Sequence, residues 1–135
     1  MLRHPKKRGE WAEMKFMARA AAHSLNVSKP WGDCSRYDFI VEYKGSFKRV
    51  QVKSTFAYRG KDSGYTCKLR PKYERNDFEF LAAYVIPEDV WYIVPMEEIV
   101  ARKALGLAPQ RSNNKFRFYM EAWHLLRRRN AGARK

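Results

Sequence analysis

The clearest hydrophobic pattern in the chain is a pair of neighbouring segments in which apolar and polar positions alternate. In residues 37–43 the odd-numbered side chains are aromatic or aliphatic, and Asp38 belongs to the opposite face. In residues 47–54 two valines alternate with Gln51 and Lys53. A period of two is typical of strands with one buried face. The short turn sequence between the segments predicts that they pair as a β-hairpin.

The rest of the chain predicts helices at both ends and apolar strands between them. A spacing of three and four residues indicates an amphipathic helix over residues 9–25. Its predicted apolar stripe consists of Trp11, Met14, Ala18, Ala21 and Leu25. Further expected elements are strands at 27–29, 65–69, 78–86, 90–94 and 116–119 and helices at 96–105 and 121–129. This order predicts a single α/β domain with a mixed sheet.

The length of the hairpin loop decides which polar residues face one another. If Lys44 and Gly45 form a two-residue loop, Asp38 faces Gln51, and if the loop begins one residue later, Asp38 faces Lys53. Both registers gather the same three side chains on one face of the hairpin. An odd-length loop would separate the apolar faces of the two strands, which argues against it.

A carboxylate and an amide oxygen are hard ligands suited to Mg²⁺, which can activate a bound water toward a phosphodiester. A neighbouring ammonium group can stabilise the charge that develops on the phosphate. The first helix could add a carboxylate from Glu10 or Glu13. The same residues also allow a simple ion pair between Asp38 and Lys53, worth under about 1 kcal/mol. The apolar surroundings of Asp38 favour the functional interpretation, because a buried carboxylate needs a partner.

The net charge of +14, from 28 basic and 14 acidic residues, favours a polyanionic partner. Residues 1–8 and 127–135 hold nine basic residues and no acidic one, and they read as basic arms that flank a domain at 9–126. Basic residues also cluster around the hairpin and the loop after it, where they could contact phosphates or simply be solvated. These candidate DNA-binding residues are Lys44, Lys48, Arg49, Arg59, Lys61, Lys68 and Arg70.

Two widely separated cysteines, Cys34 and Cys67, exclude a disulfide scaffold and a CxxC metal site. No apolar stretch is long enough to predict a membrane span. The composition therefore favours a cytoplasmic protein that does not bind membranes.

The assembled motifs resemble the PD-(D/E)xK nuclease superfamily, most closely its small homing endonucleases from group I introns. Archaeal Holliday-junction resolvases are similar at a greater distance. The resemblance is carried by Gly9-x-x-x-Glu13, Tyr37-Asp38-Phe39, Arg49-Val50-Gln51-Val52-Lys53-Ser54 and the apolar runs at 80–87 and 91–95. It implies a restriction-endonuclease-like αβββαβ core in which helices flank a mixed β-sheet.

The resemblance also implies roles for individual residues. Glu13 corresponds to the helix carboxylate, Asp38 to the central metal ligand and Lys53 to the catalytic lysine. Gln51 stands where most members have Asp or Glu, so the site has one negative charge fewer but keeps an oxygen ligand. Periodicity alone favours Glu10 over Glu13, because Glu10 lies nearer the predicted stripe, whereas the spacing from Gly9 favours Glu13.

These features together predict a Mg²⁺-dependent endonuclease that cuts double-stranded DNA, with Mn²⁺ as a substitute for Mg²⁺. Cutting both strands requires two sites, so we expect a homodimer or a homotetramer. Two alternatives remain open. One is a non-catalytic nucleic-acid-binding domain, which Gln51 favours, and the other is a resolvase of branched DNA.

Overall fold

The computed structural model describes residues 3–32, 34–60, 63–70 and 72–129. Its one α-helix within these ranges, α1, spans Pro5–Ala22. The strands are β1 (Asn26–Ser28), β2 (Phe39–Tyr43), β3 (Ser46–Thr55), β4 (Tyr65–Lys68), β5 (Phe80–Val85), β6 (Val90–Pro95) and β7 (Ala104–Leu107). Short 3-10 helices are η1 (Ile86–Glu88), η2 (Met96–Glu98), η3 (Arg117–Tyr119) and η4 (Trp123–Arg127). None of these described helices has the length and apolar character needed to cross a membrane.

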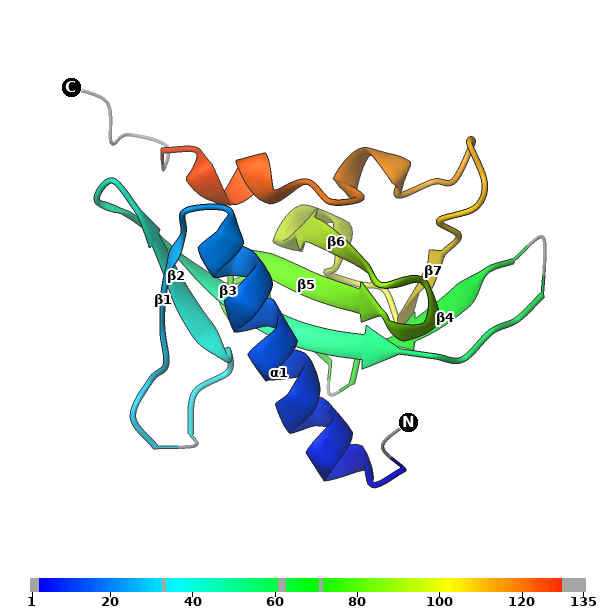
Figure 1. The fold of residues 1–135 in the computed structure, drawn as a ribbon, viewed down its shortest axis with the longest axis horizontal. Helices are drawn as coiled ribbons and strands as arrows, with labels where there is room; N and C mark the ends of the chain where they lie inside the picture. The colour runs from blue at the N-terminus through cyan, green and yellow to red at the C-terminus, as the bar shows by residue number, and fades with distance from the viewer. Residues whose placement is uncertain (1–2, 33, 61–62, 71, 130–135) are drawn as a thin grey trace.

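Five strands form a mixed sheet in the order β1-β2-β3-β5-β6 (Figure 1). The β3–β5 pair is parallel and the other three pairs are antiparallel. Between β3 and β5 the chain passes through β4, which pairs with β7 in a separate two-stranded ribbon. The expected α/β class with a mixed sheet is therefore confirmed.

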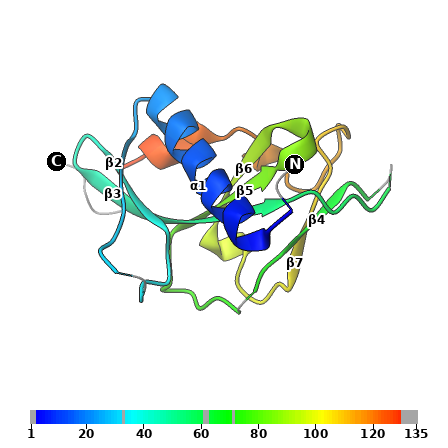
Figure 2. The same ribbon diagram turned by 60° about the horizontal axis from the view of Figure 1, so that its bottom comes forward.

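Both faces of the central strands are covered, which explains the continuous apolar character of β5. On one face α1 and η4 enclose a core that includes Phe16, Phe39, Trp91 and Trp123 (Figures 1 and 2). The β4–β7 ribbon and η2 cover the opposite face, around a second core. Because neighbouring residues of β5 point to opposite faces, this strand contributes to both cores.

The predicted hairpin forms with the first of its two possible registers. Tyr43 pairs with Ser46, which leaves Lys44 and Gly45 as a two-residue loop. Both loop residues have positive φ angles, 49° for Lys44 and 83° for Gly45. A loop of this kind matches the twist of the paired strands, and glycine adopts the second position without steric cost.

The first helix forms, but its predicted apolar stripe is correct only at its first and last residues, which pack with the core. The helix begins at Pro5, inside the basic arm, and it buries Ala12, Phe16 and Ala20. Met14 of the predicted stripe is 57% exposed. A helix rich in alanine and methionine has several apolar stripes along its surface. The stripe that packs against the sheet is the one in which two alanines flank Phe16, because its shape fits the surface of the sheet.

Three predictions near the C-terminus are corrected. The expected helix at 96–105 consists of η2 followed by β7, because β4 needs a hydrogen-bonding partner along its edge. The expected strand at 116–119 contains the 3-10 helix η3. In place of a helix over 121–129, the chain forms η4, a short 3-10 helix.

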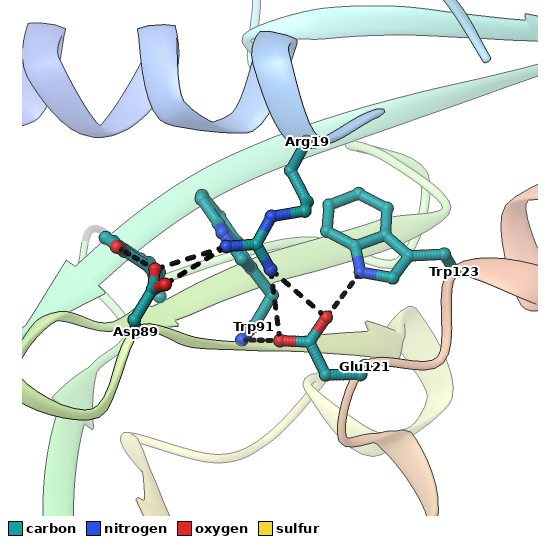
Figure 3. Close-up of polar contacts among 6 residues, drawn as sticks. Arg19, Asp89, Trp91, Glu121 and Trp123 are labelled. Carbon is teal, nitrogen blue, oxygen red and sulfur yellow. Dashed lines mark hydrogen bonds and ion pairs between the residues drawn. The ribbon is translucent and has the colours of Figure 1, made fainter. Parts of the chain in front are cut away.

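Polar contacts fasten the C-terminal half of α1 to the rest of the domain (Figure 3). The Arg19 guanidinium contacts the carboxylates of Asp89 at 3.2 Å and Glu121 at 3.4 Å. Glu121 also accepts hydrogen bonds from the Trp91 main-chain N–H and the Trp123 indole N–H, both at 2.8 Å. This network holds the helix against β6 and η4, and thereby sets which helical residues lie near the hairpin.

Candidate active site

Asp38 directly precedes β2, and both its main chain and its side chain form hydrogen bonds with β3 of the hairpin. Its main-chain N–H donates to the Val50 carbonyl oxygen at 2.9 Å. Its Oδ2 accepts a hydrogen bond from the Val52 main-chain N–H at 2.8 Å. The carboxylate thus replaces a main-chain acceptor at the end of the strand pair, which fixes its position next to β3.

Gln51 and Lys53 lie on the same face of the sheet as Asp38. Phe39 pairs with Val50, so the register continued by one residue places Asp38 opposite Gln51. Lys53 follows two positions later on β3 and therefore points to the same side. Its Nζ donates to the Arg70 carbonyl oxygen at 2.6 Å, which holds the ammonium group at this face.

A buried tyrosine forms the apolar wall of this cluster. Tyr73 is 5% exposed, and its ring centroid lies 5.9 Å from the Lys53 Nζ. Its hydroxyl lies near Asp38 and Gln51, but the approach to the Gln51 amide falls short of a hydrogen bond of ordinary geometry. The pKa of Tyr73 is raised by burial and by the neighbouring Cys67 and Asp38, so the hydroxyl stays protonated.

Glu13 reaches the cluster from α1, whereas Glu10 is exposed. The side chain of Glu13 is 27% exposed, and its Oε1 contacts Lys29 Nζ at 2.9 Å. The same ammonium lies 3.4 Å from the Asp38 carbonyl oxygen. Lys29 thus bridges the helix carboxylate and the first strand of the hairpin. The structure brings together all four residues predicted for the site.

The pKa of Asp38 reflects its burial and the charged groups around it. Burial raises the pKa of the Asp38 carboxyl above its usual value of 3.8, and the Glu13 carboxylate raises it further. The hydrogen bond from Val52 and the ammonium groups of Lys29 and Lys53 lower it without cancelling the rise. A cation bound beside Asp38 would relieve the repulsion between the two carboxylates.

The donor set fits a hard divalent cation. Asp38 and Glu13 offer carboxylate oxygens and Gln51 an amide oxygen, which are ligands that Mg²⁺ accepts when water completes its shell. In the described ranges no three His, Cys, Asp or Glu side chains are grouped to hold a metal. A metal here would therefore depend on the two carboxylates and the Gln51 amide. The charge of Glu13 is balanced by the ammonium group of Lys29.

The candidate DNA-binding residues do not share one surface. Lys48 is 5% exposed, and its ammonium contacts the Ser46 hydroxyl and the Arg128 carbonyl oxygen. Arg49 pairs with Glu79 at 2.5 Å. Lys44 occupies the hairpin loop, while Arg59, Lys68 and Arg70 are exposed near the far end of β3. Lys61 lies outside the described residues.

Sequence reasoning missed Lys29. It follows β1, and the β1–β2 register of Ser28 with Ile40 carries it beside the start of β2. Its ammonium also lies 4.6 Å from the Phe39 ring centroid. A three-residue strand gives little pattern to predict its partner, so no local signal pointed to Lys29.

Comparisons with known proteins show the family and a similar fold. The family model described as PD-(D/E)XK endonuclease matches residues 3–126. The fold is similar to the solved structure of a bacterial homing endonuclease, I-Ssp6803I, with a TM-score of 0.77 and 27% sequence identity. This likeness covers 91% of the present chain and 93% of the other. No curated protein sequence matches the chain.

Proposed function

The chain belongs to the PD-(D/E)XK endonuclease family, and from this premise we propose that it is a homing-type, divalent-metal-dependent enzyme that hydrolyses phosphodiester bonds of double-stranded DNA. That it is a DNA endonuclease follows from the family and from the homing endonuclease that shares its fold. The metal, the duplex substrate and the roles of individual residues are proposals. They rest on the site geometry and on the net charge of +14.

The hairpin register is the observation that carries the proposal. The pairing of Phe39 with Val50 leaves Asp38, Gln51 and Lys53 on one face. A register shifted by one residue would have moved Asp38 to the face opposite Lys53 and separated the ligand from the ammonium. Glu13, whose charge acts on Asp38, would add a second carboxylate to this site from the helix side.

Each residue has a distinct proposed role. Asp38, Gln51 and Glu13 would hold the metal, which when bound supplies Lewis-acid activation of the phosphodiester and of water. Lys53 places a positive charge beside the phosphate and stabilises the negative charge that develops there. The Arg70 carbonyl orients the Lys53 ammonium, and Tyr73 excludes water from one side of it.

The test is cleavage of a supercoiled plasmid by the full chain with Mg²⁺, with Mn²⁺ and with EDTA. We expect nicking or linearisation only with a divalent cation. Asp38→Asn and Lys53→Met should each lower the rate by about a hundredfold or more, because each removes a group that stabilises the transition state. Gel electrophoresis of the plasmid forms measures both effects.

Lys115→Met is the matched control for Lys53→Met, and it should retain most of the cleavage rate, because Lys115 is exposed and belongs neither to the candidate site nor to the candidate DNA-binding residues. If the unmodified protein binds DNA but cuts no DNA with either metal, the proposal is wrong. The chain would then be a non-catalytic DNA-binding domain.

A further inference from the structure

A second basic feature adjoins the proposed catalytic cluster. A pocket of about 250 Å³ lies at the C-terminal end of β3, between the start of α1 and β4. Among the described residues, its lining has no acidic side chain and four cationic ones: Arg8, Lys53, Arg59 and Lys68. Because Lys53 also belongs to the catalytic cluster, the pocket adjoins the site proposed to hold the cleaved phosphate.

Arg8 is held in a defined position at this pocket. Its guanidinium carbon lies 4.7 Å from the ring centroid of Phe56, and it donates to the Arg3 carbonyl oxygen at 3.4 Å. Phe56, which directly follows β3, is 48% exposed. The guanidinium is planar by itself, and its contact with an aromatic ring restrains the orientation of that plane, from which the N–H groups can contact two phosphate oxygens at once.

The backbone that forms the pocket wall is fixed by hydrogen bonds. The hydroxyl of Thr55 donates to the Thr66 carbonyl oxygen at 2.6 Å and accepts from the Ala57 N–H at 3.1 Å. These bonds tie the end of β3 to β4, which carries Lys68. The backbone that carries Lys53 on β3 and Lys68 on β4 is therefore joined by hydrogen bonds.

A larger groove at the opposite end of β3 differs in charge. This groove, of about 740 Å³, is lined by cationic and acidic residues together. Its Arg49 is paired with Glu79, and Lys48 contacts protein oxygens. The carboxylates of the larger groove repel a phosphate, so the pocket whose described charged residues are all cationic is the better candidate.

We infer that the pocket beside Lys53 binds a backbone phosphate of DNA that neighbours the cleaved phosphate, and that Arg8 is its main ligand, with Lys68 as a second. This inference rests on the proposed function. It places the DNA backbone along the C-terminal end of β3 and the first turns of α1, away from the hairpin loop. It also gives part of the N-terminal basic segment a specific role.

The test measures the affinity of the full chain for a labelled duplex by fluorescence anisotropy, in EDTA and at several salt concentrations. Arg8→Gln and Lys68→Gln should each weaken binding by about tenfold at moderate salt. Each should also reduce the slope of log affinity against log salt by about one, because one phosphate contact is lost. Arg75→Gln, at the larger groove, is the matched control and should leave the slope unchanged.

A cleavage assay supplies a second measurement. Arg8→Gln should raise KM and leave kcat within a few-fold, because Arg8 is not placed at the reacting phosphate. The inference is overturned if Arg8→Gln and Arg75→Gln have the same slope, whether both are unchanged or both reduced. If the unmodified protein neither binds nor cuts DNA, the proposed function itself fails, which is a different result.

Discussion

At the scale of single residues, Asp38 combines a structural and a proposed chemical role. Its carboxylate accepts the Val52 N–H, yet burial and Glu13 raise its pKa. A raised pKa means that the folded protein holds this proton more tightly than the unfolded chain. Ionisation of Asp38 therefore opposes folding, and stability falls as the pH rises from the ordinary value of 3.8 through the raised one.

We therefore predict that Asp38→Asn unfolds at a higher temperature than the unmodified protein at neutral pH. The amide can still accept the Val52 N–H bond, and it carries no charge to bury. The difference should vanish below the ordinary aspartate pKa, where Asp38 is neutral in both states. Thermal denaturation followed by circular dichroism across a pH series measures it.

Glu79→Gln is the comparison variant, because it should change the unfolding temperature in the opposite direction to Asp38→Asn. Burial tends to raise the pKa of Glu79, but the hydrogen bonds and charge of Arg49 hold it below its ordinary value. Its ionised form therefore contributes stability above that value, and the contribution is lost as the pH falls. Glu79→Gln should lower the unfolding temperature at neutral pH. A destabilised Asp38→Asn variant would contradict the account of Asp38.

At the scale of elements, the β4–β7 ribbon depends on close contact between two backbones. Gly64 directly precedes β4 and has a φ of 68°. A Cβ at this position would lie 2.3 Å from the Leu107 carbonyl oxygen and 2.7 Å from the Ala108 Cα. Both are main-chain atoms that cannot turn aside as a flexible side chain can. The ribbon in turn covers one core and carries Lys68 to the basic pocket.

We predict that Gly64→Ala lowers the free energy of unfolding by more than about 1–2 kcal/mol, because a positive φ and a backbone clash act together. Gly106→Ala, on the facing strand, is the control, since its Cβ would meet nothing within 4 Å. Urea denaturation of both variants provides the measurement. Equal midpoints for the two variants would mean that the ribbon tolerates a wider separation.

At the scale of the whole molecule, each copy of the chain has one proposed active site, whereas a DNA duplex has two strands to cut. One copy can then cut one strand in a binding event, and a break in both strands calls for a second copy. A pair of copies related by a two-fold axis would present two equivalent sites to the duplex. The net charge of +14 makes assembly on DNA sensitive to salt.

We predict that mixing the unmodified protein with excess Asp38→Asn turns plasmid linearisation into nicking, because most of the pairs that hold an active site then hold only one. Agarose gels resolve the nicked and linear forms, and light scattering should give at least twice the chain mass. Linearisation that simply falls in proportion to the active protein, without a rise in nicked circles, would indicate that single copies cut both strands.

The hairpin and its polar face could be predicted from the sequence, because both depend on local chemistry. Side-chain alternation places Gln51 and Lys53 together, and a Lys44-Gly45 loop is compatible with the matching apolar faces. The sequence allowed two registers, and the structure selects the one with Asp38 opposite Gln51. The mixed sheet followed equally well from the run of apolar segments.

The helix face could not be predicted in this way. Several apolar stripes run along α1, and the predicted one would have favoured Glu10. The packing of Phe16 against Phe39 and Trp91, with ring centroids 5.4 and 5.6 Å apart, turns Glu13 toward the hairpin instead. The edge of β4 likewise pairs with β7, which begins in a segment whose sequence predicts a helix.

The sequence by itself therefore determined which polar groups lie together through short-range periodicity. These are a carboxylate, an amide and an ammonium group on one strand pair, in a strongly basic chain. Tertiary structure decided which helix carboxylate joins them, that Lys29 balances it, and that Arg8 and Lys68 meet at one pocket. The physical reason is that contacts between distant segments depend on the packing of whole surfaces, which no local spacing encodes.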